Sequence, residues 1–407
     1  MTVRQFVFNG LKETLIQKRY SNLIMKEARF DPQDQRFASA LFYSTLQNYD
    51  WMCFQVESYL KSKPHQEIMI ILAMACSQYY LMDAVAPYAI VNEAVELTKQ
   101  NRLGRYSGLV NAVLKKCFRE PVRYSATGDF QIDLAINTSH PQWMVGLFLA
   151  QLGIEQTKQL LLHNNTVAPL YVRLHPHKIT VEEAMDRYGV YIDGQGFLVA
   201  PASILNTAAL ENGELVIQDI ASQQVVSTFE KKQGIRFLDC CCAPGTKLSQ
   251  LALFDESEGV GIDLHPHRIE LTQALLRRWD LTNVTLLAQD FLTYKDDQGF
   301  DSILCDVPCS GLGVLRRKAD LKFSITSQDL DELQVLQAKI LDQAYSLLKV
   351  GGELVYSTCT LNKKENEKQI EAFLQKYPDM KLIQEKTLYP WQWNSDGFYI
   401  AHCRKDA

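Results

Sequence analysis

The stretch "LDCCCAPGTK" (residues 238–247) decides the fold of the last part of this chain, because it joins an apolar strand pattern to a helix pattern. Pro244 fixes the turn, Gly245 allows a close approach of the backbone to a ligand, and the following helix offers unpaired N–H groups. The stretch is neither a GxGxxG fingerprint nor a P-loop, which disfavours a diphosphate cofactor. It therefore predicts a ligand-binding loop of another kind.

Strands and helices alternate regularly from about residue 234 to the end of the chain. This alternation predicts an α/β, Rossmann-like domain at 234–407 with a parallel sheet and helices on both faces. Ligands of such sheets bind beyond the carboxyl ends of the strands. The expected strands are "IRFLDC", "GVGIDL", "VTLLAQD", "FDSILCD" and "GGELVYST", with helices near 246–254, 266–279, 328–348 and 363–376.

Two acids end the second and third of these strands. Asp263 is placed to accept hydrogen bonds from ribose hydroxyls, and Asp290 is placed to accept one from an adenine amino group. Together with the glycine turn, they predict a pocket for S-adenosylmethionine. Taken alone, each acid is equally compatible with a solvent-facing residue of any doubly wound domain.

Two cysteines follow the fourth and fifth strands. Cys309 lies in "FDSILCDVPCSGLG" (300–313) just after Asp306, and Cys359 lies in "YSTCTLNKKENE" (356–367). A thiolate that adds to carbon 6 of a pyrimidine makes carbon 5 nucleophilic enough to accept a methyl group, and a nearby carboxylic acid can hold the base. The alternative is that both cysteines are small buried residues at strand ends, which methylation at nitrogen would allow.

The remaining cysteines and histidines indicate no metal site. The ten cysteines form no CxxC pair, and His140, His265 and His267 lack the spacing of metal ligands. We expect reduced thiols in a cytoplasmic protein, with no membrane segment, since the longest apolar run has nine residues.

The first 233 residues predict two further domains. Residues 1–122 show apolar spacings of three and four that predict an all-helical bundle of five to seven helices, and 123–233 predict a linker helix, entered through Ser139, and a small α+β domain with an RNA-recognition-like sheet. Residues 1–120 hold 15 Lys and Arg against 11 Asp and Glu, which is compatible with local RNA contact. A solvated helical face gives the same count.

At "CCAPGTK", "DVPCSG" and "STCT" followed by "ENE", the chain resembles the RNA cytosine-5 methyltransferases of the Sun/Fmu (RsmB) group. The resemblance spans essentially the whole chain and implies a NusB-like RNA-binding domain at the N-terminus and a class I methyltransferase domain at the C-terminus. It implies that Cys359 is the nucleophile, that Cys309 assists product release, and that Asp306 completes the site. The cofactor residues that it implies are Cys241, Cys242, Ala243, Pro244, Gly245, Thr246, Lys247, Asp263, Asp290 and Asp306.

Two further features lie in or next to these motifs. Thr246 replaces the second glycine of the family loop and can cap the helix that follows. The basic run "LRRKADLKF" (315–323) offers Arg316, Arg317 and Lys318 to RNA phosphates, although such runs are usually solvated loops.

The resemblance implies S-adenosylmethionine-dependent methylation of a cytidine at carbon 5 in 16S rRNA, by a monomer that acts on naked or early-assembly RNA. Two alternatives stay open: a tRNA cytosine-5 methyltransferase with the same chemistry, and a NusB-like RNA-binding factor that has lost activity.

Overall fold

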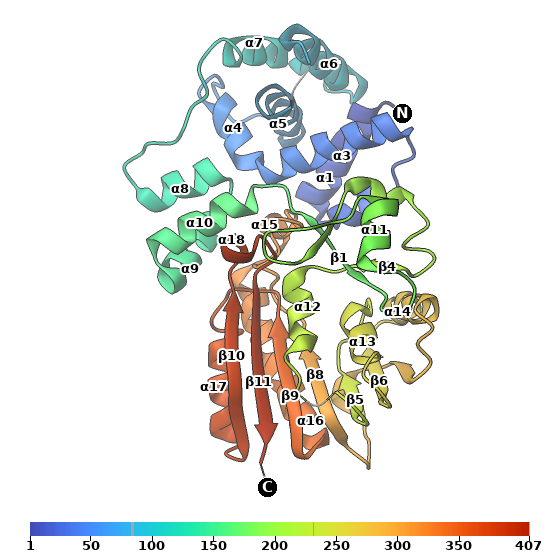
Figure 1. Cartoon of the computed structure of the whole chain (residues 1–407). Helices are drawn as coiled ribbons and strands as arrows, with labels where there is room; N and C mark the ends of the chain where they lie inside the picture. Colours follow the sequence, from blue (N-terminus) through green and yellow to red (C-terminus); the bar gives the residue numbers. More distant parts are fainter. Residues whose placement is uncertain (83–84, 231, 407) are drawn as a thin grey trace. The chain divides into compact units, whose positions relative to one another are not determined.

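The computed structural model of the chain describes residues 1–82, 85–230 and 232–406, which form two compact units (Figure 1). The first unit comprises Met1–Thr166 and Leu315–Ile325, and the second comprises the remaining described residues. The predicted domain boundaries at 122 and 233 stay predictions.

The first unit is all helical. Its central helix α5 is buried on nearly every side, because residues 68–76 are all apolar. The helical pattern predicted for the first 120 residues is confirmed by α1 to α7. The helices are α1 (Val3–Gln17), α2 (Ser21–Lys26), α3 (Pro32–Gln47), α4 (Tyr49–Glu57), α5 (Gln66–Leu81), α6 (Pro87–Gln100), η1 (Gly104–Tyr106), α7 (Ser107–Cys117), α8 (Phe130–Thr138), α9 (Gln142–Leu152), α10 (Ile154–Asn164) and α15 (Leu321–Ser324).

Ser139 does not begin a helix as the sequence suggested. It has a φ of 56° and ends α8, whereas Pro141 begins α9. The hydroxyl of Ser139 instead accepts a hydrogen bond of 2.9 Å from the backbone N–H of Asp50 at the start of α4. The serine therefore connects two helices rather than capping the next one.

The segment Leu315–Ile325 folds with the helical unit although it lies far along the chain. Ala319 is buried in the core of this unit, and the side chain of Asp320 accepts a hydrogen bond of 2.7 Å from Ser21. The ammonium group of Lys322 is buried, where it donates to the backbone carbonyls of Gln47 at 2.9 Å and Ser139 at 3.1 Å. The segment is thus an integral part of the helical unit.

The second unit contains a small antiparallel sheet in the order β2-β3-β1-β4. The predicted α+β segment is confirmed. Thr180 caps the start of its helix in a capping box, and Gly189 ends the helix in the left-handed conformation. The elements are β1 (Leu170–Leu174), α11 (Val181–Tyr188), β2 (Tyr191–Ile192), β3 (Leu198–Ala200), η2 (Ala202–Asn206), β4 (Leu215–Ile217) and α12 (Ile220–Ser227).

The large sheet of this unit has seven strands in the order β10-β11-β9-β8-β5-β6-β7. The five predicted strands, β5 to β9, are parallel and confirmed, but β10 and β11 add an antiparallel edge that the sequence analysis did not include, so the sheet is mixed. The strands are β5 (Arg236–Asp239), β6 (Glu258–Asp263), β7 (Val284–Ala288), β8 (Phe300–Asp306), β9 (Leu348–Thr358), β10 (Met380–Leu388) and β11 (Phe398–Lys405).

Helices cover both faces of the large sheet. In Figure 1, α16 and α17 lie behind the sheet and α12 lies in front of it. Ile340 and Phe373, from the rear helices, pack against Leu354 and Tyr399 of the sheet. The remaining helices of the unit are α13 (Thr246–Leu251), α14 (Pro266–Arg278), η3 (Phe291–Thr293), α16 (Ser327–Leu347), α17 (Glu367–Lys376) and α18 (Pro390–Trp393).

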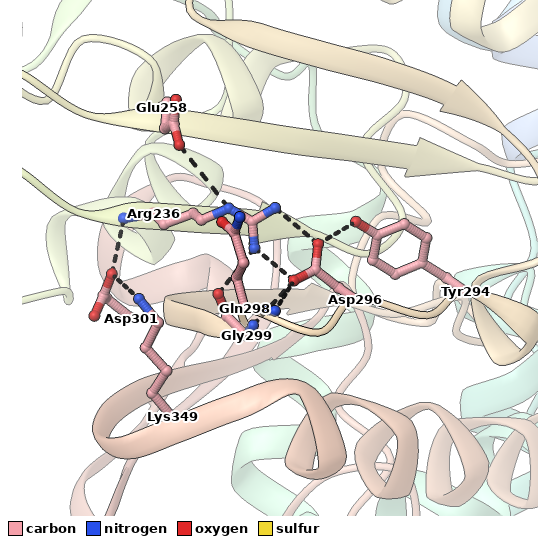
Figure 2. A network of polar contacts seen from close by, with 8 residues as sticks. All are labelled: Arg236, Glu258, Tyr294, Asp296, Gln298, Gly299, Asp301 and Lys349. Atoms are coloured by element: carbon pink, nitrogen blue, oxygen red, sulfur yellow. Dashed lines mark hydrogen bonds and ion pairs between the residues drawn. The ribbon is translucent and has the colours of Figure 1, made fainter.

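An ionic network fixes the amino ends of the parallel strands (Figure 2). Both terminal nitrogens of Arg236, the first residue of β5, donate to the carboxylate of Asp296 at 2.7 Å. The hydrogen bonds from Arg236 lower the pKa of Asp296 to about 2. Asp301 on β8 accepts from the backbone of Arg236 at 3.0 Å and from Lys349 on β9 at 2.9 Å. The network holds the strands in register at the edge opposite to their carboxyl ends.

Among the described residues, no helix combines the length and the apolar character that crossing a membrane requires.

Candidate functional site

The predicted site residues lie together at the carboxyl ends of the parallel strands. Asp239 ends β5, Asp263 ends β6, and Asp306 ends β8 beside Ser357 of β9. Because neighbouring parallel strands end at the same edge, the register alone places these carboxylates together. Asp239 was not among the predicted site residues, although the motif "LDCCCAPGTK" contains it.

The loop from Cys241 to Lys247 joins β5 to α13, as the sequence predicted. The peptide bond between Ala243 and Pro244 is cis, and Gly245 has a φ of 101°. A Cβ atom on Gly245 would lie 2.9 Å from the side chain of Thr272. The glycine is therefore required by its left-handed conformation and by its packing against α14, and not only by the approach of a ligand.

Thr246 does not cap the helix, which corrects the sequence interpretation. Gly245 occupies the cap position, and Thr246 is the first residue of α13. Its backbone carbonyl accepts a hydrogen bond of 3.0 Å from Arg173 of β1, which also donates to the hydroxyl of Ser249 at 2.7 Å. The guanidinium lies over the ring of Trp279. Arg173, which the sequence analysis did not identify, thus ties the small sheet to the cofactor-loop helix.

Lys247 and Asp306 form an ion pair at the centre of this edge. The ammonium nitrogen lies 2.8 Å from Asp306 Oδ2, and the hydroxyl of Ser357 donates to Asp306 Oδ1 at 2.7 Å. Burial opposes the shift, but the charge of Asp306, and then that of Cys359, raise the pKa of Lys247 above its usual value. The pair fixes the orientation of the Asp306 carboxylate.

Asp263 is almost fully buried and is held by Arg268 of α14. Arg268 Nη1 lies 3.1 Å from Asp263 Oδ2, and Nη2 donates to the carbonyl of Ala243 in the cofactor loop at 2.9 Å. Arg268 therefore links the acid to the loop, a role that no sequence pattern indicated. Asp290 lies two residues beyond the end of β7 and is exposed, and its carboxylate caps the turn η3 by accepting from Leu292 N–H at 2.9 Å.

Asp239 is a buried carboxyl group in an acidic surrounding. Burial raises its pKa to about 8, and the charge of Asp306 adds to this effect. The backbone N–H of Cys241 donates to its Oδ1 at 3.3 Å. At neutral pH most of this group is protonated, so Asp239 can donate a hydrogen bond where its neighbours can only accept.

The two predicted cysteines meet at this edge. Cys309 Sγ lies 3.2 Å from Cys359 Sγ, and the backbone N–H of Cys359 lies 3.3 Å from Cys309 Sγ. Both side chains are partly accessible, unlike Cys305 and Cys403, which are buried. Partial accessibility distinguishes Cys309 and Cys359 from the buried cysteines at other strand ends, and their roles in a reaction stay a prediction.

The two thiols differ in their electrostatic surroundings. The hydrogen bond to Cys359, together with burial, raises the pKa of Cys309 well above its usual value, so its sulfur keeps its proton and can donate it toward Cys359. Cys359, in contrast, interacts electrostatically with the ammonium group of Lys247.

Close backbone contacts hold the two cysteine loops together. Val307 N–H donates to the carbonyl of Ser357 at 3.1 Å, and Gly313 N–H donates to the carbonyl of Cys359 at 3.0 Å. A Cβ atom on Gly313 would lie 2.1 Å from the carbonyl oxygen of Gly397. Only glycine fits at position 313, which explains the second glycine after Cys309 in the motif.

The predicted RNA-contacting arginines belong to the helical unit. Arg316 Nη1 lies 2.9 Å from His163 Nε2, and Lys318 is exposed. The role of this basic run toward phosphates stays a prediction. Among the described residues, no group of three or more His, Cys, Asp or Glu side chains is arranged to hold a metal ion.

The chain matches three family profiles. Residues 226–404 match the family described as 16S rRNA methyltransferase RsmB/F, residues 1–119 match the NusB family, and residues 140–188 match the ferredoxin-like domain of RsmF/B-like methyltransferases. The probable ribosomal RNA small subunit methyltransferase B of Bacillus subtilis (strain 168) is 30% identical, with 99% of each chain covered. The chain belongs to the RsmB/F family of 16S rRNA methyltransferases.

One further relative and two solved structures are similar to this chain over much of its length. The ribosomal RNA small subunit methyltransferase B of Yersinia pseudotuberculosis is 27% identical over 98% of this chain and 97% of its own. The crystal structure of a methyltransferase homolog from Pyrococcus horikoshii has a TM-score of 0.60 at 26% identity, over 69% of this chain and 100% of that one. The structure of PH0851 has a TM-score of 0.81 at 20% identity over 98% and 99% of the two chains, which shows a shared fold.

These matches confirm the predicted architecture of a NusB-like helical domain, a small α+β domain and a Rossmann-like methyltransferase domain, and they describe the middle domain as ferredoxin-like. Membership of the RsmB/F family makes the protein an RNA methyltransferase with S-adenosylmethionine as its methyl donor.

Proposed function

We propose that this protein methylates carbon 5 of a cytidine in 16S ribosomal RNA through a covalent bond between Cys359 and the base. The observation that carries the proposal is the 3.2 Å separation of Cys359 Sγ and Cys309 Sγ beside the Lys247–Asp306 pair. Methylation at nitrogen would need neither thiol, whereas methylation at carbon 5 has a use for both.

The residues present fit S-adenosylmethionine. The loop Cys241–Lys247 leads into a helix amino end, and buried Asp263 is suited to hydroxyl groups of a ribose. Exposed Asp290, two residues beyond the neighbouring strand, is available to the adenine amino group. S-adenosylmethionine, when bound, supplies the electrophilic methyl group. Arg268, which touches both Asp263 and the loop, would keep these parts of the site in register.

The two thiols then take different roles. The Cys359 thiolate bonds to carbon 6 of the flipped-out base and makes carbon 5 nucleophilic, while the carboxylate of Asp306 holds the edge of the ring. After carbon 5 is methylated, water takes up its proton, the electrons of the carbon–hydrogen bond restore the double bond of the ring, and the sulfur leaves carbon 6 as the Cys359 thiolate. Cys309, whose raised pKa keeps its thiol protonated, assists this release by donating a hydrogen bond to the departing sulfur.

Removal of Cys309 tests the proposal. Cys309→Ala incubated with 16S rRNA and S-adenosylmethionine should accumulate a protein–RNA adduct that survives denaturing electrophoresis, because release is blocked. The Cys309→Ala, Cys359→Ala double variant should form none. Cys305→Ala, which removes a buried sulfur from the same strand end, is the matched control and should turn over without accumulating adduct.

The RNA found in the trapped adduct identifies the substrate. Bisulfite sequencing of adducted 16S rRNA should show one modified cytidine. Adduct formed with transfer RNA instead would assign the tRNA reaction, and an adduct that persists without Cys359 would reverse the roles of the two thiols. No adduct and no methyl transfer with either RNA would favour a binding factor without activity.

A further inference from the structure

Glu365 is a fully buried carboxylate that the proposed reaction leaves without a role. It follows Cys359 by six residues, between β9 and α17, and its side chain is 0% exposed. Four hydrogen bonds from neutral donors converge on its two oxygens. They come from Ser310 N–H at 2.9 Å, Ser310 Oγ at 2.5 Å, Gln337 Nε2 at 3.0 Å and Asn362 Nδ2 at 3.0 Å.

Two of the residues that donate these hydrogen bonds, Ser310 and Gln337, hold the backbone on both sides of Cys309. Ser310 directly follows Cys309 and gives both its N–H and its hydroxyl to Glu365. Gln337, on α16, also donates to the carbonyl of Pro308 at 2.9 Å, directly before Cys309. The position of the Cys309 backbone is therefore set by the carboxylate and its glutamine partner.

Glu365 is also connected to the chain that carries Cys359, through Ser310 on the side of its carboxylate and through its own backbone carbonyl. The hydroxyl of Thr360 lies 2.8 Å from Ser310 Oγ, which is itself bonded to Glu365. The backbone carbonyl of Glu365 accepts from Tyr356 at 2.7 Å. One buried residue thus connects the chains that carry the two thiols.

We propose that Glu365 is a positioning residue that holds Cys309 and Cys359 at the spacing and orientation that their reaction needs. This inference rests on the proposed function. The two oxygens of a carboxylate accept all four of these hydrogen bonds. In a glutamine at 365 an NH₂ group replaces one oxygen, and its two N–H groups would face groups that are themselves donors. Leaving buried donors unpaired is costly, so the loops would shift to find other partners.

The test compares Glu365→Gln with Glu371→Gln, an exposed acid of α17. Both are made in the Cys309→Ala background and in the protein that keeps both thiols. We expect Glu365→Gln to slow adduct formation at least tenfold in the first background, with affinity for S-adenosylmethionine within twofold of the parent by calorimetry. Glu371→Gln should match the parent in both measurements.

A second readout separates positioning from a role in stability alone. In the protein with both thiols, the equilibrium between the dithiol and the Cys309–Cys359 disulfide is measured in glutathione mixtures by alkylation and mass spectrometry. Glu365→Gln should shift this equilibrium constant at least tenfold, because it depends on the geometry of the two sulfurs. A role in stability alone would lower the melting temperature and leave both readouts of the folded protein unchanged.

The outcomes distinguish this inference from the proposed function. If Cys309→Ala alone traps no adduct, the proposed function fails, and the thiol–disulfide equilibrium still tests Glu365. If it traps adduct and Glu365→Gln changes neither the rate nor the equilibrium, the positioning role is overturned while the function stands. If Glu365→Gln does not fold, Ser310→Ala decides: a threefold to tenfold slower adduct supports the role, and an unchanged rate overturns it.

Discussion

The sulfur of Cys309 lies 3.2 Å from the sulfur of Cys359, with fifty residues of chain between them. A disulfide needs a separation of about 2 Å, so a small movement brings the pair to bonding distance. The short distance between the two sulfurs suits a reaction that uses both thiols, and it also makes the site sensitive to oxidants.

We expect diamide to convert Cys309 and Cys359 into a disulfide and to abolish methyl transfer, with recovery in dithiothreitol. Peptide mapping under non-reducing conditions would identify the cross-linked pair. Cys309→Ala cannot form this bond and serves as the control. Loss of activity with both thiols still free to alkylate would contradict the prediction.

Asp239→Asn should make stability less dependent on pH. The folded pKa is about 8 because of burial and the charge of Asp306, against an unfolded value of 3.8. Between these values the folded state binds more protons, so the free energy of unfolding falls as pH rises, by up to about 1.4 kcal/mol per pH unit. Urea unfolding at pH 5.5 and 7.5 should show this fall in the parent and a smaller fall in the variant. If the free energy of unfolding fell equally in both proteins, the prediction would be refuted.

Asp296→Asn should destabilise the second unit. Its hydrogen bonds with Arg236 lower the folded pKa to about 2, so this contribution is present above the unfolded value and is lost as pH falls from about 4 to about 2. Because solvent screens this pair, urea unfolding at pH 7 should show a free energy of unfolding about 1 kcal/mol lower in the variant than in the parent, and an unchanged value would contradict the prediction. The neighbouring exposed residue gives the control variant Asp297→Asn, which should change the free energy of unfolding by less than about 0.5 kcal/mol.

Lys322→Met should alter stability at alkaline pH. Burial lowers the pKa of Lys322 to about 7, although the charge of Asp50 acts in the opposite direction. Between pH 7 and 10.5 the unfolded state binds more protons, so this lysine makes stability rise with pH. Chemical unfolding at pH 7.5 and 9.5 should show a smaller rise in the variant than in Lys318→Met, which replaces an exposed lysine of the same segment. If the free energy of unfolding rose equally with pH in the two variants, the lowered pKa of buried Lys322 would be contradicted.

Sequence periodicity predicted the helices α1 to α7 and the five parallel strands because each of those elements carries its own apolar pattern. The antiparallel strands β10 and β11 were missed. β10 places "KLIQEK" at the exposed edge of the sheet, where neither a buried run nor a following helix distinguishes a strand, and β11 pairs between β10 and β9 with no helix after it. Cys309, Cys359 and the acids Asp263, Asp290 and Asp306 could be placed near one another because each follows or ends a strand, although Asp239, which also ends a strand, was missed. Arg173, Arg268 and Glu365 act through contacts between distant segments, for which one sequence carries no local signal.

The inclusion of Leu315–Ile325 in the helical unit has a consequence for biosynthesis. The amino-terminal helices leave the ribosome long before Ala319 and Lys322 are translated, and until then they lack part of their interior. Complete folding of this unit therefore waits for more than half of the methyltransferase domain to be synthesised. A truncated protein that ends before residue 315 would keep those helices and expose the surface that the later segment covers.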